Sequence, residues 1–146
     1  VRLAYLPGYE LTWHKASADR SGKCDIVPAE DRNKKVFGVL YEIDPAEKEN
    51  LDLAEGMGTH YREVSVSVIA INGPKIAFTY IALPDKTEPG KVPYRWYKDF
   101  VVEGAREHGL PEEYIAELSK VEAKADPDQR RREKNRKILA SNSKTT

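Results

Sequence analysis

Short runs of alternating or continuous apolar residues dominate the first third of the chain. Bulky apolar and polar residues alternate over residues 9–15, which predicts a half-buried strand. A short apolar run over residues 24–27 predicts another strand. Residues 36–43 are almost continuously apolar, which predicts a strand buried on both faces. The N-terminal region therefore predicts sheet rather than helix.

A second stretch of alternation predicts a β-hairpin. Residues 61–71 alternate, and the pair Asn72 and Gly73 that follows favours a tight turn between antiparallel strands. Residues 76–81 then return as the second strand. On the first strand we expect one face to carry the small apolar side chains Val64, Val66, Val68 and Ala70.

Helix-start and helix-stop residues flank the hairpin on both sides. Asp44 can cap a helix that begins at Pro45 and ends near Glu55, before Gly56. The apolar residues of this helix, Leu51 and Ala54, are expected to face the core.

Two further helices are predicted after the hairpin. A helix is expected to begin at Pro93 and to close at Gly109, and another to begin at Pro111. The first has an apolar stripe of helical spacing, formed by Tyr94, Tyr97, Val101, Ala105 and His108. The second is expected to point three side chains inward: Tyr114, Ile115 and Leu118.

This order of elements predicts an α+β fold with a small mixed β-barrel or curled sheet and flanking helices. The domain is expected over residues 1–125, and residues 126–146 are interpreted as a polar, basic surface segment or frayed tail.

The distribution of charge along the chain limits the classes of binding partner. The net charge is zero, but residues 1–125 carry −4 and residues 126–146 carry +4. An acidic body argues against a nucleic-acid-binding core. Arg130–Arg132 are expected to be a solvated surface, with weak binding of an acidic partner as the alternative. No apolar run approaches the roughly 18–20 residues of a membrane span, so no membrane association is expected.

Residue types that carry metal or coenzyme chemistry are sparse. The sequence contains no phosphate-binding loop, dinucleotide fingerprint or zinc-protease motif. Its histidines, His14, His60 and His108, are widely scattered, and the single cysteine, Cys24, is expected to be a buried, inert thiol. We therefore expect no metal, no cofactor and a reducing, cytoplasmic location.

Glu55 is the most informative candidate for catalysis. It falls in the last turn of its predicted helix, where the negative end of the helix dipole favours the neutral form of a carboxyl group. Such a group suits proton transfer near neutral pH. The alternative is an ordinary solvated glutamate, which local sequence alone favours.

Tyrosines are the second set of candidate functional residues. Tyr41, Tyr61, Tyr80, Tyr94 and Tyr97 are spread over the predicted strands and the second helix. They either line a pocket with aromatic walls and hydroxyl groups, or pack at the core and its rim.

Several spaced motifs together resemble the γ-glutamylcyclotransferase family. The likeness runs from about Leu3 to Leu118. It rests on the segments LPGYEL (6–11), GKCDIVP (22–28), FGVLYE (37–42), LDLAEG (51–56) and GAREHGLPEEY (104–114).

The resemblance implies an enzyme that releases 5-oxoproline and a free amine by cyclising a γ-glutamyl amide. It implies that Glu55 is the catalytic carboxylate and that Tyr61, Tyr80 and Tyr97 surround the small-molecule substrate. The substrate's own amine would be the nucleophile, so no metal or cofactor is needed. A homodimer is possible.

The sequence departs from the family at its start. The family opens with a strand and a Tyr-Gly-Ser-Asn loop thought to bind the glutamyl group, and this tetrapeptide does not occur here. Since the chain begins at Val1 rather than Met, we expect the natural protein to be longer and to be an ordinary enzyme. The alternative is a module of the same fold that binds a small molecule or a partner without turnover.

Overall fold

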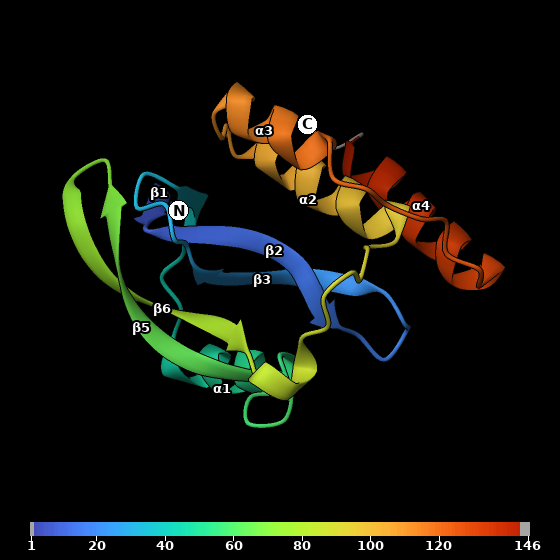
Figure 1. Cartoon of the computed structure of the whole chain (residues 1–146), viewed down its shortest axis with the longest axis horizontal. Coiled ribbons are helices and arrows are strands. Elements are labelled where there is room, and N and C mark those ends of the chain that lie inside the picture. The colour runs from blue at the N-terminus through green and yellow to red at the C-terminus, as the bar shows by residue number, and fades with distance from the viewer. Residues whose placement is uncertain (1, 144–146) are drawn as a thin grey trace.

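The computed structural model describes residues 2–143, which form a curled antiparallel sheet flanked by helices (Figure 1). The predicted α+β class is confirmed. The strands are β1 (Arg2–Pro7), β2 (Tyr9–Ala16), β3 (Gly22–Pro28), β4 (Lys35–Leu40), β5 (Tyr61–Ala70) and β6 (Gly73–Ala82). The helices are α1 (Pro45–Ala54), α2 (Arg95–Glu107), α3 (Glu112–Ser119) and α4 (Gln129–Ser143), with a 3₁₀ turn at Pro84–Lys86.

The strands form two sheets that close on each other. One has the order β4-β1-β5-β6 and the other pairs β2 with β3, and these strand pairs are antiparallel. Strand β3 contacts β6, while β2 contacts β4. The backbone N–H of Ala82 also donates to Asp25 Oδ1 at 2.9 Å, which joins β6 to β3. The two-stranded sheet therefore contacts β4 and β6, which are the two edge strands of the four-stranded sheet. These contacts curl the strands into a barrel-like arrangement.

Two apolar clusters hold this arrangement together. The first joins β1 to the predicted apolar face of β5 through four buried residues: Ala4, Leu6, Val68 and Ala70. The second packs β2 against the helices α2 and α3, which lie on one side of it in Figure 1. Its buried members are Trp13, Val102, Ala105, Leu110 and Leu118. Helix α1 lies on the opposite side, beside β5 and β6.

Helix α1 begins as its sequence predicts but packs differently. Pro45 is its first residue, and the Glu47 side chain accepts a hydrogen bond from the Asp44 N–H at 3.4 Å. None of its residues is fully buried; Leu51 is half-buried and Ala54 is exposed. The expected apolar face is therefore wrong for Ala54, because α1 is held to the sheet largely by polar and ionic contacts rather than by an apolar stripe.

Other boundaries and burials also differ from the sequence prediction: β3 (Gly22–Pro28) is longer at both ends, and β6 begins at Gly73 rather than residue 76. The first strand, β1, was not predicted, because apolar and polar residues do not alternate regularly over residues 2–7. Strand β4 ends at Leu40 rather than residue 43, and it is mostly half-buried because it ends the four-stranded sheet. Helix α2 begins at Arg95, with Tyr94 as its N-cap, two residues later than predicted.

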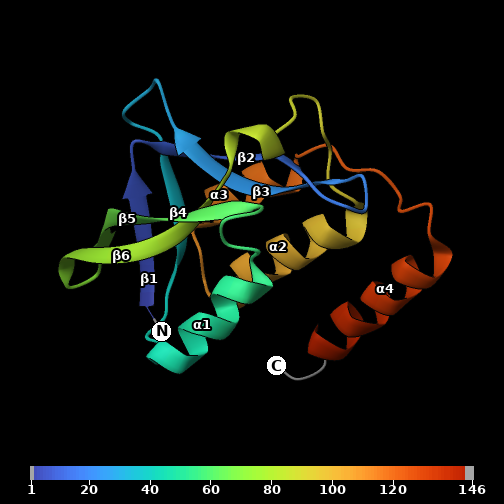
Figure 2. The same cartoon turned by 90° about the horizontal axis from the view of Figure 1, so that it is seen from below.

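The polar C-terminal segment forms a helix rather than a frayed tail, and most of its described side chains are exposed, in agreement with the alternative interpretation as a surface segment. Helix α4 packs along α2 on the side away from the strands (Figure 2). The Asp126 side chain is completely buried and accepts hydrogen bonds from Arg131 Nε at 2.5 Å and Nη2 at 2.6 Å. Trp96 Nε1 donates to the same carboxylate at 2.9 Å. The expectation of a solvated arginine run is wrong for Arg131 and for Arg132, which donates to the Asp126 carbonyl. Residues 144–146 lie outside the described residues.

The Asp126 carboxylate predicts an acid-sensitive step in stability. Hydrogen bonds from Arg131 hold the pKa of Asp126 well below its usual range. A carboxyl group with a depressed folded-state pKa contributes stability above its unfolded pKa of about 3.9, and loses it as pH falls through the folded value. We expect the difference in unfolding free energy between wild type and Asp126→Asn, measured by urea denaturation, to shrink from pH 5 to pH 2. A constant difference would contradict this origin of the stability.

Within residues 2–143, no helix combines the length and apolar character that crossing a membrane requires.

Candidate active site

Glu55 caps the C-terminal end of α1 and is half-buried. Its backbone is helical, and its N–H donates to the Leu51 carbonyl at 2.8 Å. The chain then reverses at Gly56, whose φ of +63° is in the left-handed region that favours glycine. This turn stops the helix directly after the carboxylate, so Glu55 is placed at the negative end of the helix dipole, as predicted.

The turn at Gly56 leaves no room for a side chain. A Cβ atom at this position would lie 2.8 Å from Cδ2 of His60. We expect Gly56→Ala to lower the unfolding free energy by about 1–2 kcal/mol, because the left-handed conformation alone costs this much for an L-residue. Chemical denaturation would measure it. Gly38→Ala is the matched control, since a Cβ there meets nothing within 4 Å; an equal loss in both variants would contradict the assignment.

Lys15 is a buried cation close to Glu55. Its exposed fraction is 6%, and its ammonium lies 3.4 Å from His60 Nδ1 and 5.3 Å from the centroid of the Tyr61 ring. Burial lowers the pKa of Lys15, the charges of Lys86 and Lys23 lower it further, and the Asp19 and Glu55 carboxylates oppose the shift. Lys15 is therefore an electrostatic neighbour of the candidate catalytic group.

Two of the three predicted substrate tyrosines meet at the backbone of Cys24. The Tyr61 hydroxyl donates to the Cys24 carbonyl at 3.4 Å, and the Tyr97 hydroxyl accepts from the Cys24 N–H at 3.0 Å. Burial raises the pKa of both phenols, and the Glu55 carboxylate adds to the shift at Tyr61. Cys24 is half-buried rather than fully buried as expected, and burial of its thiol raises the pKa to about 12, which keeps it protonated near neutral pH.

Tyr80 belongs to a different group of contacts. Its hydroxyl donates to Asp52 on α1, and burial together with this bond raises the pKa of Tyr80 to about 12. Lys48 bridges Asp52 at 3.1 Å and Glu63 at 2.5 Å in the same cluster. The structure therefore brings Tyr61 and Tyr97 together, and it places Tyr80 where it fastens α1 to the hairpin.

Lys15 was not among the site residues that the sequence pattern indicated. Lysine is rarely buried, so the residue was counted among the polar positions of its strand. The spacing along the strand could have indicated it, because Lys15 lies two residues after Trp13 and the two side chains therefore share one face of β2. In the structure both are buried, whereas His14 between them is exposed.

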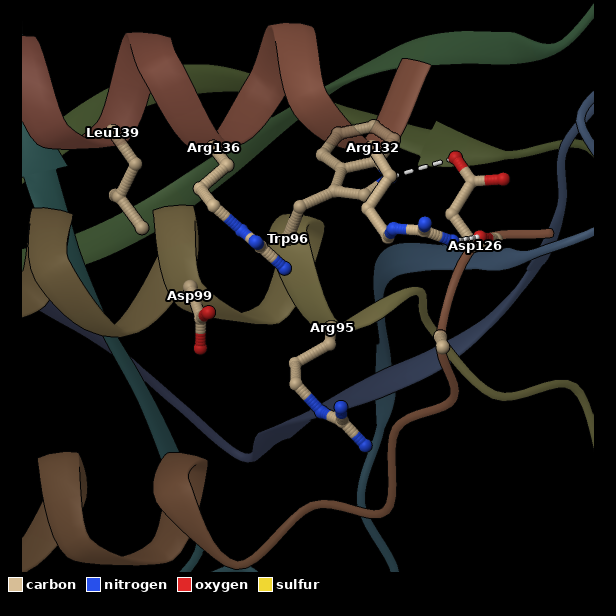
Figure 3. Close-up of a pocket in the computed structure, with 8 residues that line it drawn as sticks. Arg95, Trp96, Asp99, Asp126, Arg132, Arg136 and Leu139 are labelled. Carbon is tan, nitrogen blue, oxygen red and sulfur yellow. Dashed lines mark hydrogen bonds between the residues drawn. The ribbon is translucent and has the colours of Figure 1, made fainter. Parts of the chain in front are cut away.

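A small pocket between α2 and α4 lies apart from these residues (Figure 3). Arg136 and Leu139 extend from α4 toward α2, and Trp96 forms a wall beside the buried Asp126. Its volume of about 70 Å³ is far below the roughly 300–1,000 Å³ of ligand pockets. We interpret it as the packing seam of α4 rather than as a substrate site.

Comparison with known proteins assigns the family. A family model described as "AIG2-like family" matches residues 35–118, which is more than half of the chain and includes Glu55, Tyr61, Tyr80 and Tyr97. The chain belongs to the AIG2-like family. A search of curated proteins found no match.

Solved structures with the same fold cover nearly all of this AIG2-like chain. A structure described as "Gamma-glutamyl cyclotransferase" matches with a TM-score of 0.78 at 22% identity, covering 97% of this chain and 84% of its own. The human uncharacterized protein loc79017 matches with the same TM-score and identity, covering 96% and 83%. YkqA from Bacillus subtilis matches with a TM-score of 0.66 at 19% identity, covering 84% and 45%. These likenesses confirm the predicted γ-glutamylcyclotransferase-like fold.

Proposed function

We propose that this protein cyclises a γ-glutamyl amide, releasing 5-oxoproline and a free amine. The observation that carries the proposal is the position of Glu55: a half-buried carboxylate at the end of α1, near enough to Lys15 and Tyr61 to influence the pKa of both. Family membership and the fold of the cyclotransferase structure support the same reaction.

The proposed reaction needs one proton carrier and a folded-back substrate. Glu55 accepts a proton from the substrate's α-ammonium group, and the free amine attacks the γ-carbonyl carbon. A C–N bond forms and the carbonyl oxygen becomes an oxyanion. When this intermediate collapses, the bond to the leaving nitrogen breaks and Glu55 gives its proton to that nitrogen. The ring nitrogen, positively charged after the attack, loses its second proton to Glu55, and the released amine takes up this proton. Holding the folded-back conformer can supply up to roughly 7–11 kcal/mol of the barrier.

The tyrosine hydroxyls suit an ammonium ligand. The hydroxyl hydrogen of Tyr61 is directed to the Cys24 carbonyl, so the oxygen remains as an acceptor for a cationic donor. Tyr97 accepts a hydrogen bond from the Cys24 N–H and also hydrogen-bonds the Cys24 side chain, so its hydroxyl is held at the same residue as that of Tyr61. We propose that these two residues contact the glutamyl group and that Tyr80 supports the site through α1.

A blocked substrate tests the reaction type. We expect the full-length protein to release alanine and 5-oxoproline in equal amounts from γ-glutamyl-alanine, and to release neither from its N-acetyl derivative, whose amine cannot attack. Release of alanine from both compounds, with glutamate from the first and N-acetylglutamate from the second, would contradict cyclisation and indicate hydrolysis.

The alternative is a binding module of the same fold. It is favoured by the hydroxyl hydrogens of Tyr61 and Tyr80, which are already directed to groups within the protein. A module would be thermally stabilised by γ-glutamyl-alanine without forming any product.

A further inference from the structure

Lys15 is a buried residue, and its ammonium has no carboxylate partner among the residues that the structure describes. Among residues 2–143, no acidic side chain forms an ion pair with it within 4 Å. Its side-chain hydrogen bond is the 3.4 Å contact with His60 Nδ1, and its other contact is the face of the Tyr61 ring. An ammonium carries three N–H donors, so this environment leaves donors unused.

A buried ammonium without a paired anion lowers the stability of the fold. A buried charge lowers stability unless it is paired and hydrogen-bonded, and an apolar side chain of similar volume would avoid the cost. Lys86 and Lys23 add positive charge around Lys15, and the Asp19 and Glu55 carboxylates only partly offset it from beyond ion-pair distance. Among residues 2–143, no carboxylate is therefore close enough to accept a hydrogen bond from the Lys15 ammonium.

We propose that Lys15 binds the α-carboxylate of the γ-glutamyl group and selects ligands that carry it. This inference rests on the proposed function and assigns the substrate class more narrowly. The α-carboxylate and the α-amine share one carbon atom, so a carboxylate held at Lys15 keeps the amine beside Glu55. Lys15 thus positions the group from which Glu55 takes its proton.

Binding of the reaction product tests the assignment without turnover. 5-Oxoproline retains the carboxylate, and 2-pyrrolidinone is the same ring without it. In NMR titrations of the full-length protein, we expect 5-oxoproline to bind at least tenfold more tightly than 2-pyrrolidinone. Lys15→Met should abolish this difference. Equal binding of both rings by the wild type, or an unchanged preference in Lys15→Met, would overturn the proposal.

Lys23→Met is the matched control. Lys23 pairs with Lys15 across β2 and β3 in the backbone register, but its ammonium is bound by Asp19 at 3.2 Å and lies over the Trp96 and Tyr97 rings. We expect this variant to keep the preference for 5-oxoproline. Thermal unfolding of Lys15→Met should be at or above the wild-type temperature, which separates lost binding from lost folding.

Kinetics distinguish this inference from the proposed function. With γ-glutamyl-alanine, Lys15→Met should raise KM at least tenfold while kcat falls less than threefold. Turnover with an unchanged KM would overturn the role of Lys15 and leave cyclisation standing. A Lys15-dependent preference for 5-oxoproline without any turnover by the wild type would support the carboxylate site and contradict cyclisation.

Discussion

Replacing Glu55 by Gln should lower kcat for 5-oxoproline release from γ-glutamyl-alanine by about 10²–10⁴-fold, the usual contribution of general acid–base catalysis. Glutamine keeps the size and polarity of the side chain but cannot accept or return a proton. The substrate-binding residues proposed here are untouched, so KM should change less than threefold. Steady-state kinetics with purified full-length protein would measure both constants.

Glu49→Gln is the control for this variant. Glu49 lies on the same helix, is exposed, and undergoes the same chemical change. We expect its kcat to stay within twofold of the wild type. If Glu55→Gln kept the wild-type kcat, Glu55 would not be the proton carrier, whatever else the protein did.

Replacing Asp126 by Ala should produce the largest loss of stability, about 3 kcal/mol, because hydrogen bonds to a charged group contribute roughly 1.5–3 kcal/mol each and buried donors would lose their acceptor. The carboxylate accepts from Trp96, from Arg131 and from the Asp128 N–H. These bonds join the segment before α4 to α2 and to α4 itself. Urea denaturation would measure the change.

In Asp126→Ala, we expect the loss of stability to affect helix α4 first and the rest of the fold afterwards. Trypsin cleaves after Lys and Arg, which are frequent between residues 129 and 143. We expect Asp126→Ala to be cleaved in this region faster than the wild type under native conditions. Asp85→Ala removes an exposed carboxylate from the 3₁₀ turn and serves as control. Unchanged stability and cleavage in Asp126→Ala would show that other contacts hold α4.

The parts of the fold that sequence patterns predicted are those with a local cause. The hairpin follows from the alternation over residues 61–71 and from the Asn-Gly turn, and α1 follows from its cap and Pro45. Helix α4 has no apolar stripe, so its pattern is that of a solvated segment. It is held by Asp126, whose role depends on burial against α2 and cannot be read from neighbouring residues.

The residues of the candidate site likewise include some that local sequence predicts and others that depend on tertiary packing. Glu55 could be placed from sequence because a helix end and a glycine define its position. The meeting of Tyr61 and Tyr97 at Cys24 joins residues 37 and 73 positions apart, so it depends on how the strands and α2 pack. Lys15 is buried for the same tertiary reason. Tyr80 resembles the other tyrosines in sequence, but it faces Asp52 on α1.

The most direct test of the proposed chemistry is the product formed from γ-glutamyl-alanine in ¹⁸O-labelled water by equal amounts of wild type and Glu55→Gln. Intramolecular attack by the amine predicts unlabelled 5-oxoproline from the wild type and almost none from Glu55→Gln. Glutamate that carries ¹⁸O, or equal yields of 5-oxoproline from the two proteins, would contradict it.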